Sequence, residues 1–127
     1  MASRIANGKN KGFTLIELLV VMAIIATLMM LVAPQYFKQT DRAKEVVLEH
    51  NIRGLREAID HYRQDLAKGP ETLDDLVSRR YLRELPLDPV TGRRDTWQTE
   101  EDDTAGIRDV RSGAAGVSLG GTAYAQW

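Results

Sequence analysis

The chain has 127 residues, of which 28% are charged and none is cysteine, and its formal net charge is −1. This length suits one small domain plus one further segment. The lack of cysteine excludes disulfides and thiolate metal sites, and the balanced charge offers no basic footprint for nucleic acid.

The first twelve residues, MASRIANGKNKG, are polar and include the basic residues Arg4, Lys9 and Lys11. We expect residues 1–12 to be a removable leader and not part of the fold. Without them the chain would carry 14 basic and 18 acidic side chains. That excess of acids argues further against a nucleic-acid partner.

An apolar run follows from Phe13 to Ala33, interrupted only by two threonines and by Glu17. As a helix it would be about 30 Å long, which matches the hydrocarbon core of a bilayer. The run ends at Pro34, and it lacks the small-residue cleavage site of a secretory signal peptide. We therefore expect residues 13–34 to cross a membrane once. The basic residues before the run place the N-terminus in the cytoplasm and residues 35–127 on the other side.

Glu17 is the unusual residue in this run, because an acid within a membrane helix costs about 2.5–3.5 kcal/mol on insertion scales. One interpretation is that its side chain reaches the headgroups of the nearby interface. The other is that the carboxylate has a cationic partner, since acids within membrane helices are functional candidates.

The segment Gly12-Phe13-Thr14-Leu15-Ile16-Glu17, preceded by a basic leader and followed by the apolar run, resembles the start of type IV pilins and type II secretion pseudopilins. The resemblance implies that a prepilin peptidase cleaves between Gly12 and Phe13 at the cytoplasmic face of the membrane. It also implies N-methylation of Phe13 and pairing of Glu17 with the Phe13 amine of a neighbouring subunit. A methylated amine keeps its positive charge, so this pairing is electrostatically favourable.

The second part of the long helix is amphipathic, from Gln39 to Lys68, with a predicted stop at Gly69-Pro70. Its apolar residues recur at spacings of three and four and form one stripe: Leu48, Ile52, Leu55, Ile59, Tyr62 and Leu66. We expect this stripe to be the inner face of a small domain. Pro34 predicts a kink between the two parts. His50 and His61 lie roughly 16 Å apart along such a helix, too far to share a metal.

Beyond the stop, the pattern predicts a short helix from Leu73 to Arg80 with Thr72 as its N-cap. The stretch Leu85 to Gly92, LPLDPVTG, is rich in turn residues. A small antiparallel sheet is expected after it, with strands at Asp95–Thr99, Gly106–Arg111 and, more weakly, Gly121–Gln126, and with an acidic loop at Glu100–Thr104.

This order of elements resembles a type II secretion pseudopilin over essentially the whole chain, and is most similar to the major, G-type pseudopilin. The resemblance implies an α+β, pilin-like fold with a long N-terminal helix, a short helix and a small C-terminal antiparallel sheet. G-type pseudopilins commonly hold calcium in a C-terminal loop, but the corresponding loop, Ser112 to Thr122, contains no acid. The remaining calcium candidates are Asp102, Asp103 and Asp109, and a solvated acidic turn is the favoured alternative. We expect no cofactor.

No serine or threonine lies in a nucleophile-elbow setting and no glycine-rich loop resembles a phosphate cradle, so we do not expect an enzyme. The resemblance implies a structural subunit of a periplasmic pseudopilus that helps to export folded proteins across the outer membrane. Its expected partners are copies of itself, the prepilin peptidase and methyltransferase, minor pseudopilins and an assembly platform in the bacterial inner membrane.

Two other functions remain open from the sequence. One is a type IV pilin for adhesion, motility or DNA uptake, which has the same N-terminal motif. The lack of a disulfide pair favours the pseudopilin over the pilin. The other is a membrane-anchored periplasmic domain that never polymerises, which would keep residues 1–12 and would give no reason for Glu17.

Overall fold

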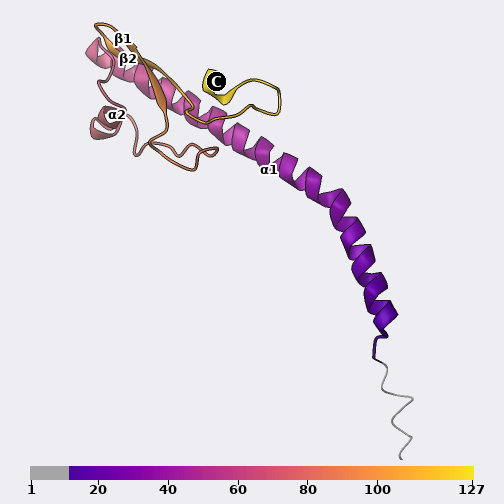
Figure 1. The fold of residues 1–127 in the computed structure, drawn as a ribbon. Helices are drawn as coiled ribbons and strands as arrows, with labels where there is room; N and C mark the ends of the chain where they lie inside the picture. The colour runs from indigo at the N-terminus through magenta and orange to yellow at the C-terminus, as the bar shows by residue number, and fades with distance from the viewer. Residues whose placement is uncertain (1–11) are drawn as a thin grey trace, which may run out of the picture. The chain divides into compact units, whose positions relative to one another are not determined.

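A computed structural model describes residues 12–127 of the chain. Its elements in order are α1 (Leu15–Leu66), α2 (Asp74–Ser78), β1 (Gln98–Asp102), β2 (Gly106–Arg111) and the 3-10 helix η2 (Tyr124–Gln126), as Figure 1 shows. The described chain divides into two compact units between Lys38 and Gln39, and α1 contributes to both. The long helix, the short helix and the small antiparallel sheet confirm the α+β, pilin-like prediction.

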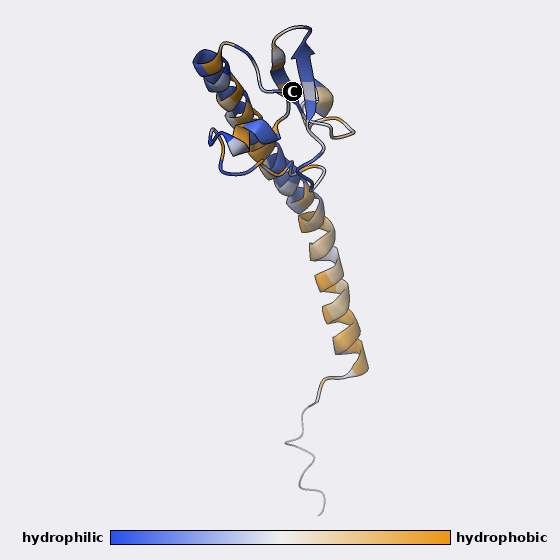
Figure 2. Cartoon of the chain, turned by 90° about the vertical axis from the view of Figure 1, so that its left-hand side faces the viewer, coloured by the Kyte–Doolittle hydropathy of each residue, from blue (hydrophilic) through white to orange (hydrophobic). Residues whose placement is uncertain are grey.

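The first unit consists of the first part of α1 and the residues just before it. Its apolar side chains are exposed, with fractions of 44–79% for the large hydrophobic residues between Leu15 and Val32. Figure 2 shows this part of α1 coloured as hydrophobic along its length. The helix continues through Pro34. A helix that is hydrophobic all round is typical of burial in a membrane or in an assembly.

The second unit is built on the predicted apolar stripe of α1. Leu48, Leu55 and Ile59 are fully buried, and Ile52 and Tyr62 are nearly so. They form one core with residues of the other elements: Leu76, Trp97, Ile107 and Val110. Full burial of such a side chain contributes roughly 1.5–3 kcal/mol, so the stripe is the main support of this unit.

The end of α1 differs slightly from the prediction, because the helix ends at Leu66 and not at Lys68. Ala67 adopts a left-handed conformation with φ of 60°, and its N–H donates to the Arg63 carbonyl at 2.9 Å. Glycine is required at position 69 because the backbone there passes very close to another segment. The Gly69 N–H donates to the Ala105 carbonyl at 2.5 Å, and a Cβ there would overlap the backbone of Ile107.

The N-cap predicted for the short helix was wrong. Helix α2 has no side-chain hydrogen bond at its N-cap, which is Leu73. The carboxylate of Asp75 instead accepts the N–H groups of Glu71 and Thr72, at 3.1 and 3.0 Å. An acid inside the first turn thus satisfies the free donors that precede the helix. As expected, the helix packs Leu76 into the core.

The sheet has two strands, and the first is shifted from its predicted position. Strand β2 matches the prediction at Gly106–Arg111, whereas β1 covers Gln98–Asp102 and so includes much of the predicted acidic loop. The acids are tolerated because β1 is largely exposed and because Glu100 forms ion pairs with Arg108 and Arg111 of β2. The hydrogen bond that Arg108 donates to Glu100 raises the pKa of Arg108.

The third predicted strand, Gly121–Gln126, was also wrong. Its only pairing in the described chain is an isolated bridge between Val117 and Ala123, and η2 follows directly. Four of the positions from Gly116 to Gly121 are glycine or serine, and such residues favour turns over a strand. The C-terminal segment is therefore held by side chains of α1 and not by a sheet.

Candidate functional site

Thr14 forms the N-cap of α1. The N–H of Glu17 donates to the Thr14 hydroxyl at 3.2 Å, and the N–H of Leu18 donates to the Thr14 carbonyl. Thr14-Leu15-Ile16-Glu17 therefore has the spacing of a capping box, in which a threonine and an acid three residues later flank the helix start. This capping box is readable in the sequence from the same motif, although it was not predicted above.

Glu17 lies in the first turn of α1 among apolar side chains. Together with Phe13, Ile16, Val20 and Val21 it lines a groove of about 440 Å³. The first turn carries the positive end of the helix dipole, which stabilises a carboxylate there by about 0.3–1 kcal/mol. An exposed acid is thus placed on a surface that is otherwise apolar.

Gly12 and Phe13 precede the helix without regular structure, and the Phe13 side chain is 85% exposed. A Cβ at position 12 would meet no atom within 4 Å, and Gly12 does not have a positive φ. The fold therefore does not require glycine at this position. The other leader residues, 1–11, lie outside the described residues.

Within residues 12–127 one helix, α1, is long and apolar enough to cross a membrane, and none of its most apolar window is buried. The predicted span, residues 13–34, overlaps the N-terminal part of this helix. This helix fits a protein that crosses a membrane once.

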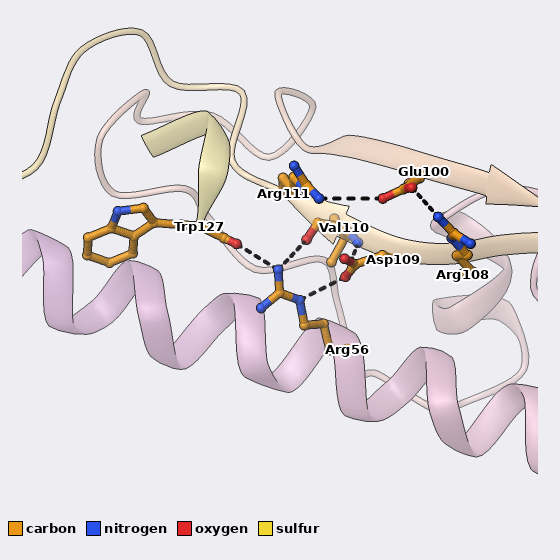
Figure 3. A network of polar contacts seen from close by, with 7 residues as sticks. All are labelled: Arg56, Glu100, Arg108, Asp109, Val110, Arg111 and Trp127. Atoms are coloured by element: carbon orange, nitrogen blue, oxygen red, sulfur yellow. Dashed lines mark hydrogen bonds and ion pairs between the residues drawn. The ribbon is translucent and has the colours of Figure 1, made fainter. Parts of the chain in front are cut away.

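In the second unit, Arg56 joins three parts of the chain. From α1 it donates to the Asp109 carboxylate at 2.8 Å, to the Val110 carbonyl at 3.2 Å and to the Trp127 carbonyl at 2.6 Å, as Figure 3 shows. Its planar guanidinium suits this arrangement, because it presents several donors in fixed directions. This network could not be predicted from the sequence, because Arg56 is more than fifty residues away from each of its partners.

Glu45 holds the other side of the C-terminal segment. Its carboxylate accepts the Leu119 N–H at 2.7 Å and the Tyr124 hydroxyl at 3.0 Å. Burial and the hydrogen bond that Tyr124 donates to Glu45 raise the pKa of the Tyr124 hydroxyl. Two charged side chains of one helix thus fix a segment that has little secondary structure.

The turn-rich stretch Leu85 to Gly92 is organised by Asp88, which is fully buried. Its carboxylate accepts the N–H groups of Val90 and Thr91 and, at 2.6 Å, the hydroxyl of Ser112. Aspartate commonly bonds the backbone two residues on in turns, so the bend was predictable. The contact with Ser112 was not.

The structure does not bring the three calcium candidates together around a free space. Asp109 forms an ion pair with Arg56, whereas Asp102 is exposed at the end of β1 and Asp103 is exposed in the turn after it. No group of three or more acidic or histidine side chains in residues 12–127 could hold a metal ion. His50 and His61 are exposed on α1.

A family model described as the prokaryotic N-terminal methylation motif matches residues 7–33. This match covers the predicted cleavage site, Phe13, Glu17 and the apolar run. A type IV major pilin protein PilA of Myxococcus xanthus is 41% identical over 49 residues, which are 39% of this chain and 22% of the pilin. No solved structure matches the chain.

Several longer matches are to proteins named type II secretion system core protein G. The protein from Pseudomonas aeruginosa is 35% identical over 97 residues, which cover 64% of this chain and 68% of the relative. That from Klebsiella michiganensis is 32% identical over 99 residues, 65% of this chain and 70% of the relative. That from Escherichia coli is 32% identical over 100 residues, 66% of this chain and 69% of the relative. On this similarity and on its N-terminal motif, the chain belongs to the family of type II secretion system core protein G, the G-type pseudopilins.

Proposed function

We propose that this protein is the structural subunit of a periplasmic pseudopilus in type II protein secretion, and that it performs no chemistry of its own. A single observation carries the proposal: Glu17 lies on an apolar, exposed helix face that nothing in the described chain covers. The chain belongs to a family of type II secretion proteins, so we expect this helix to be covered by other subunits of a type II secretion system.

The proposed processing follows from the residues around the helix start. A prepilin peptidase would cleave between Gly12 and Phe13, and the new amine of Phe13 would be methylated. Two facts support this cleavage site: the methylation-motif match and the lack of any need for glycine at position 12 in the fold. The cleaved chain would stay in the inner membrane through residues 13–34, with residues 35–127 in the periplasm.

In the proposed assembly step, Glu17 of one subunit pairs with the Phe13 amine of a neighbour. A carboxylate left unpaired in lipid is costly, and pairing removes that cost only when a second subunit is present. The apolar faces between Phe13 and Val32 would then pack against each other. A repeated heterologous contact whose rotation does not close into a ring produces a fibre.

The test is replacement of Glu17 with Ala in cells that contain the prepilin peptidase and the secretion apparatus. We expect E17A to be inserted, cleaved and methylated, so that its intact mass falls by residues 1–12 and gains one methyl group, while filaments are absent. Glu57→Ala is the matched control, because Glu57 is an exposed acid of α1 in the second unit.

Filaments formed normally by E17A would refute the pairing, and a parent protein that retains residues 1–12 would favour a tethered domain that never polymerises. The similarity to the Myxococcus pilin supports the pilin alternative less strongly, because it covers only 22% of that pilin. Deletion of the gene separates the two functions. A loss of exported folded proteins supports the pseudopilin, whereas a loss of surface fibres with intact secretion supports the pilin.

A further inference from the structure

A groove in the second unit lies between α1 and Trp127. It has a volume of about 410 Å³ and is lined by Glu49, Ile52, Arg53, Arg56 and Trp127. Ile52 and Trp127 supply apolar walls, and the guanidinium groups of Arg53 and Arg56 supply positive charge. Arg56 also fixes the groove, because it holds the Trp127 backbone against α1.

Arg53 is the cation of this groove that is available to a ligand. Its only ion pair in the described residues is with Glu49 at 3.1 Å, and the two side chains are 67% and 62% exposed. Such i,i+4 pairs on a helix surface contribute only about 0.3–0.5 kcal/mol. A cluster of several carboxylates would therefore compete well for Arg53.

Three acids at the tip of the β1–β2 hairpin, from the end of β1 into the turn, form such a cluster on the same molecule. Glu101, Asp102 and Asp103 are consecutive and exposed, and none of them forms an ion pair within the part of the chain that the structure describes. Glu100 differs, because Arg108 and Arg111 neutralise it. This acidic turn thus presents three carboxylates that have no ion pair of their own in the described residues, and Asp102 also lies close enough to Arg108 to help raise the pKa of that guanidinium.

One copy cannot bring its own turn into its own groove. The hairpin is fixed beside the C-terminal end of α1 by the bonds from Gly69 to Ala105 and from Ile107 to Pro70. The groove starts at Glu49, and α1 rises about 25 Å between Glu49 and Leu66. Within one copy, the three acids and Arg53 therefore lie at different heights along α1. A second copy that is shifted along the helix axis can bring its acids to the height of Arg53.

We propose that the acidic turn of one copy, Glu101 to Asp103, binds the groove between α1 and Trp127 of a second copy, with Arg53 as its cationic partner. This proposal rests on the proposed function, because it describes how the second units of neighbouring subunits meet in the filament. The contact is head-to-tail and uses two different surfaces, so it continues along a fibre and does not close a dimer.

Disulfide cross-linking tests the contact directly, because the chain has no cysteine of its own. Glu49→Cys places a thiol in the groove and Thr104→Cys places one in the turn, while Arg53 and the three acids are kept. We expect filaments of the double variant to give a ladder of cross-linked dimers, trimers and longer chains on oxidation. The two single variants, as controls, should not give a ladder.

Charge reversal is the second arm. Arg53→Glu or Asp102→Lys should lower the cross-linking yield about threefold to tenfold, the range expected for an exposed charge pair turned repulsive. The combination of both reversals should restore it. Arg83→Glu, at an exposed position outside the groove and the turn, is the control for net charge and should leave the yield unchanged.

The outcomes separate this proposal from the proposed function. Filaments that form normally but give no cross-linked ladder overturn the contact and leave the pseudopilin function intact. Cross-linking that is insensitive to both charge reversals also overturns it. If the cleaved parent protein forms no filaments at all, the proposed function fails and the contact fails with it.

Discussion

At the scale of single residues, Gly69 and Gly54 show that glycine occurs in this fold for different structural reasons. Gly69 lies where the backbone passes closest to the hairpin, so that a Cβ would overlap the Ile107 backbone. Gly54 lies within α1, and a Cβ there would meet nothing within 4 Å. The two glycines cannot be told apart from the sequence, because a close approach of the backbone depends on residues far along the chain.

We therefore predict opposite effects for two substitutions of the same kind. Gly69→Ala should lower the free energy of unfolding by about 1–3 kcal/mol, because the backbone must shift to admit the methyl group. Gly54→Ala should raise it by about 0.5–1 kcal/mol, because alanine loses less conformational freedom in a helix. Denaturant unfolding of both variants measures the difference. Equal effects would contradict the observed packing at Gly69.

Tyr124 gives a prediction about pH. Burial and the hydrogen bond to Glu45 raise its pKa, so its contribution to stability is complete below about pH 10, the usual tyrosine value. The contribution is lost as the pH rises through the higher value of the folded state, because the phenolate cannot donate to Glu45. The parent should thus lose more stability than Tyr124→Phe between pH 9 and about pH 11. Chemical denaturation at several pH values measures this, and parallel curves would contradict it.

At the scale of elements, α1 organises the second unit through charges as well as through its apolar stripe. Arg56 and Glu45 reach opposite sides of the C-terminal segment, and only an isolated bridge and a short 3-10 helix give that segment regular structure. The hairpin adds the bond between Arg56 and Asp109. Removal of one of these side chains should therefore loosen a whole element.

Arg56 and Arg53, three residues apart on the same helix, test this idea. Arg56→Ala should lower the free energy of unfolding by about 1–3 kcal/mol, because it leaves a partly buried carboxylate and two carbonyls without their donor. Arg53→Ala should change it by less than about 0.5 kcal/mol, as expected for an exposed pair. Arg56→Lys should fall between the parent and Arg56→Ala, because lysine keeps the charge but lacks the planar fork. Similar losses in Arg53→Ala and Arg56→Ala would refute the role given to Arg56.

At the scale of the whole molecule, the two compact units depend on different surroundings. The buried hydrophobic residues all lie between Leu48 and Ala114, whereas the large apolar residues from Phe13 to Val32 are exposed. The second unit therefore has its own core, and the first unit has none in the described chain.

We accordingly predict that a fragment of residues 39–127 folds without the preceding helix. It should be monomeric without detergent and should unfold cooperatively, because no core residue has been removed. Circular dichroism during thermal unfolding and light scattering check both points. A fragment without a cooperative transition would show that the second unit needs the preceding helix.

Features that depend on local pattern could be predicted from the amino-acid sequence alone: the apolar run, the motif from Gly12 to Glu17, the buried stripe of α1 and the position of β2. These follow from composition and from the helical period, which neighbouring residues carry. The extension of β1 into the acids around Glu100 and the attachment of the C-terminal segment through Glu45 and Arg56 followed only from the three-dimensional fold. The physical reason is that these outcomes depend on partners distant in sequence: an acid enters a strand when arginines face it across the sheet, and a segment without a strand is fixed when a helix supplies its hydrogen bonds.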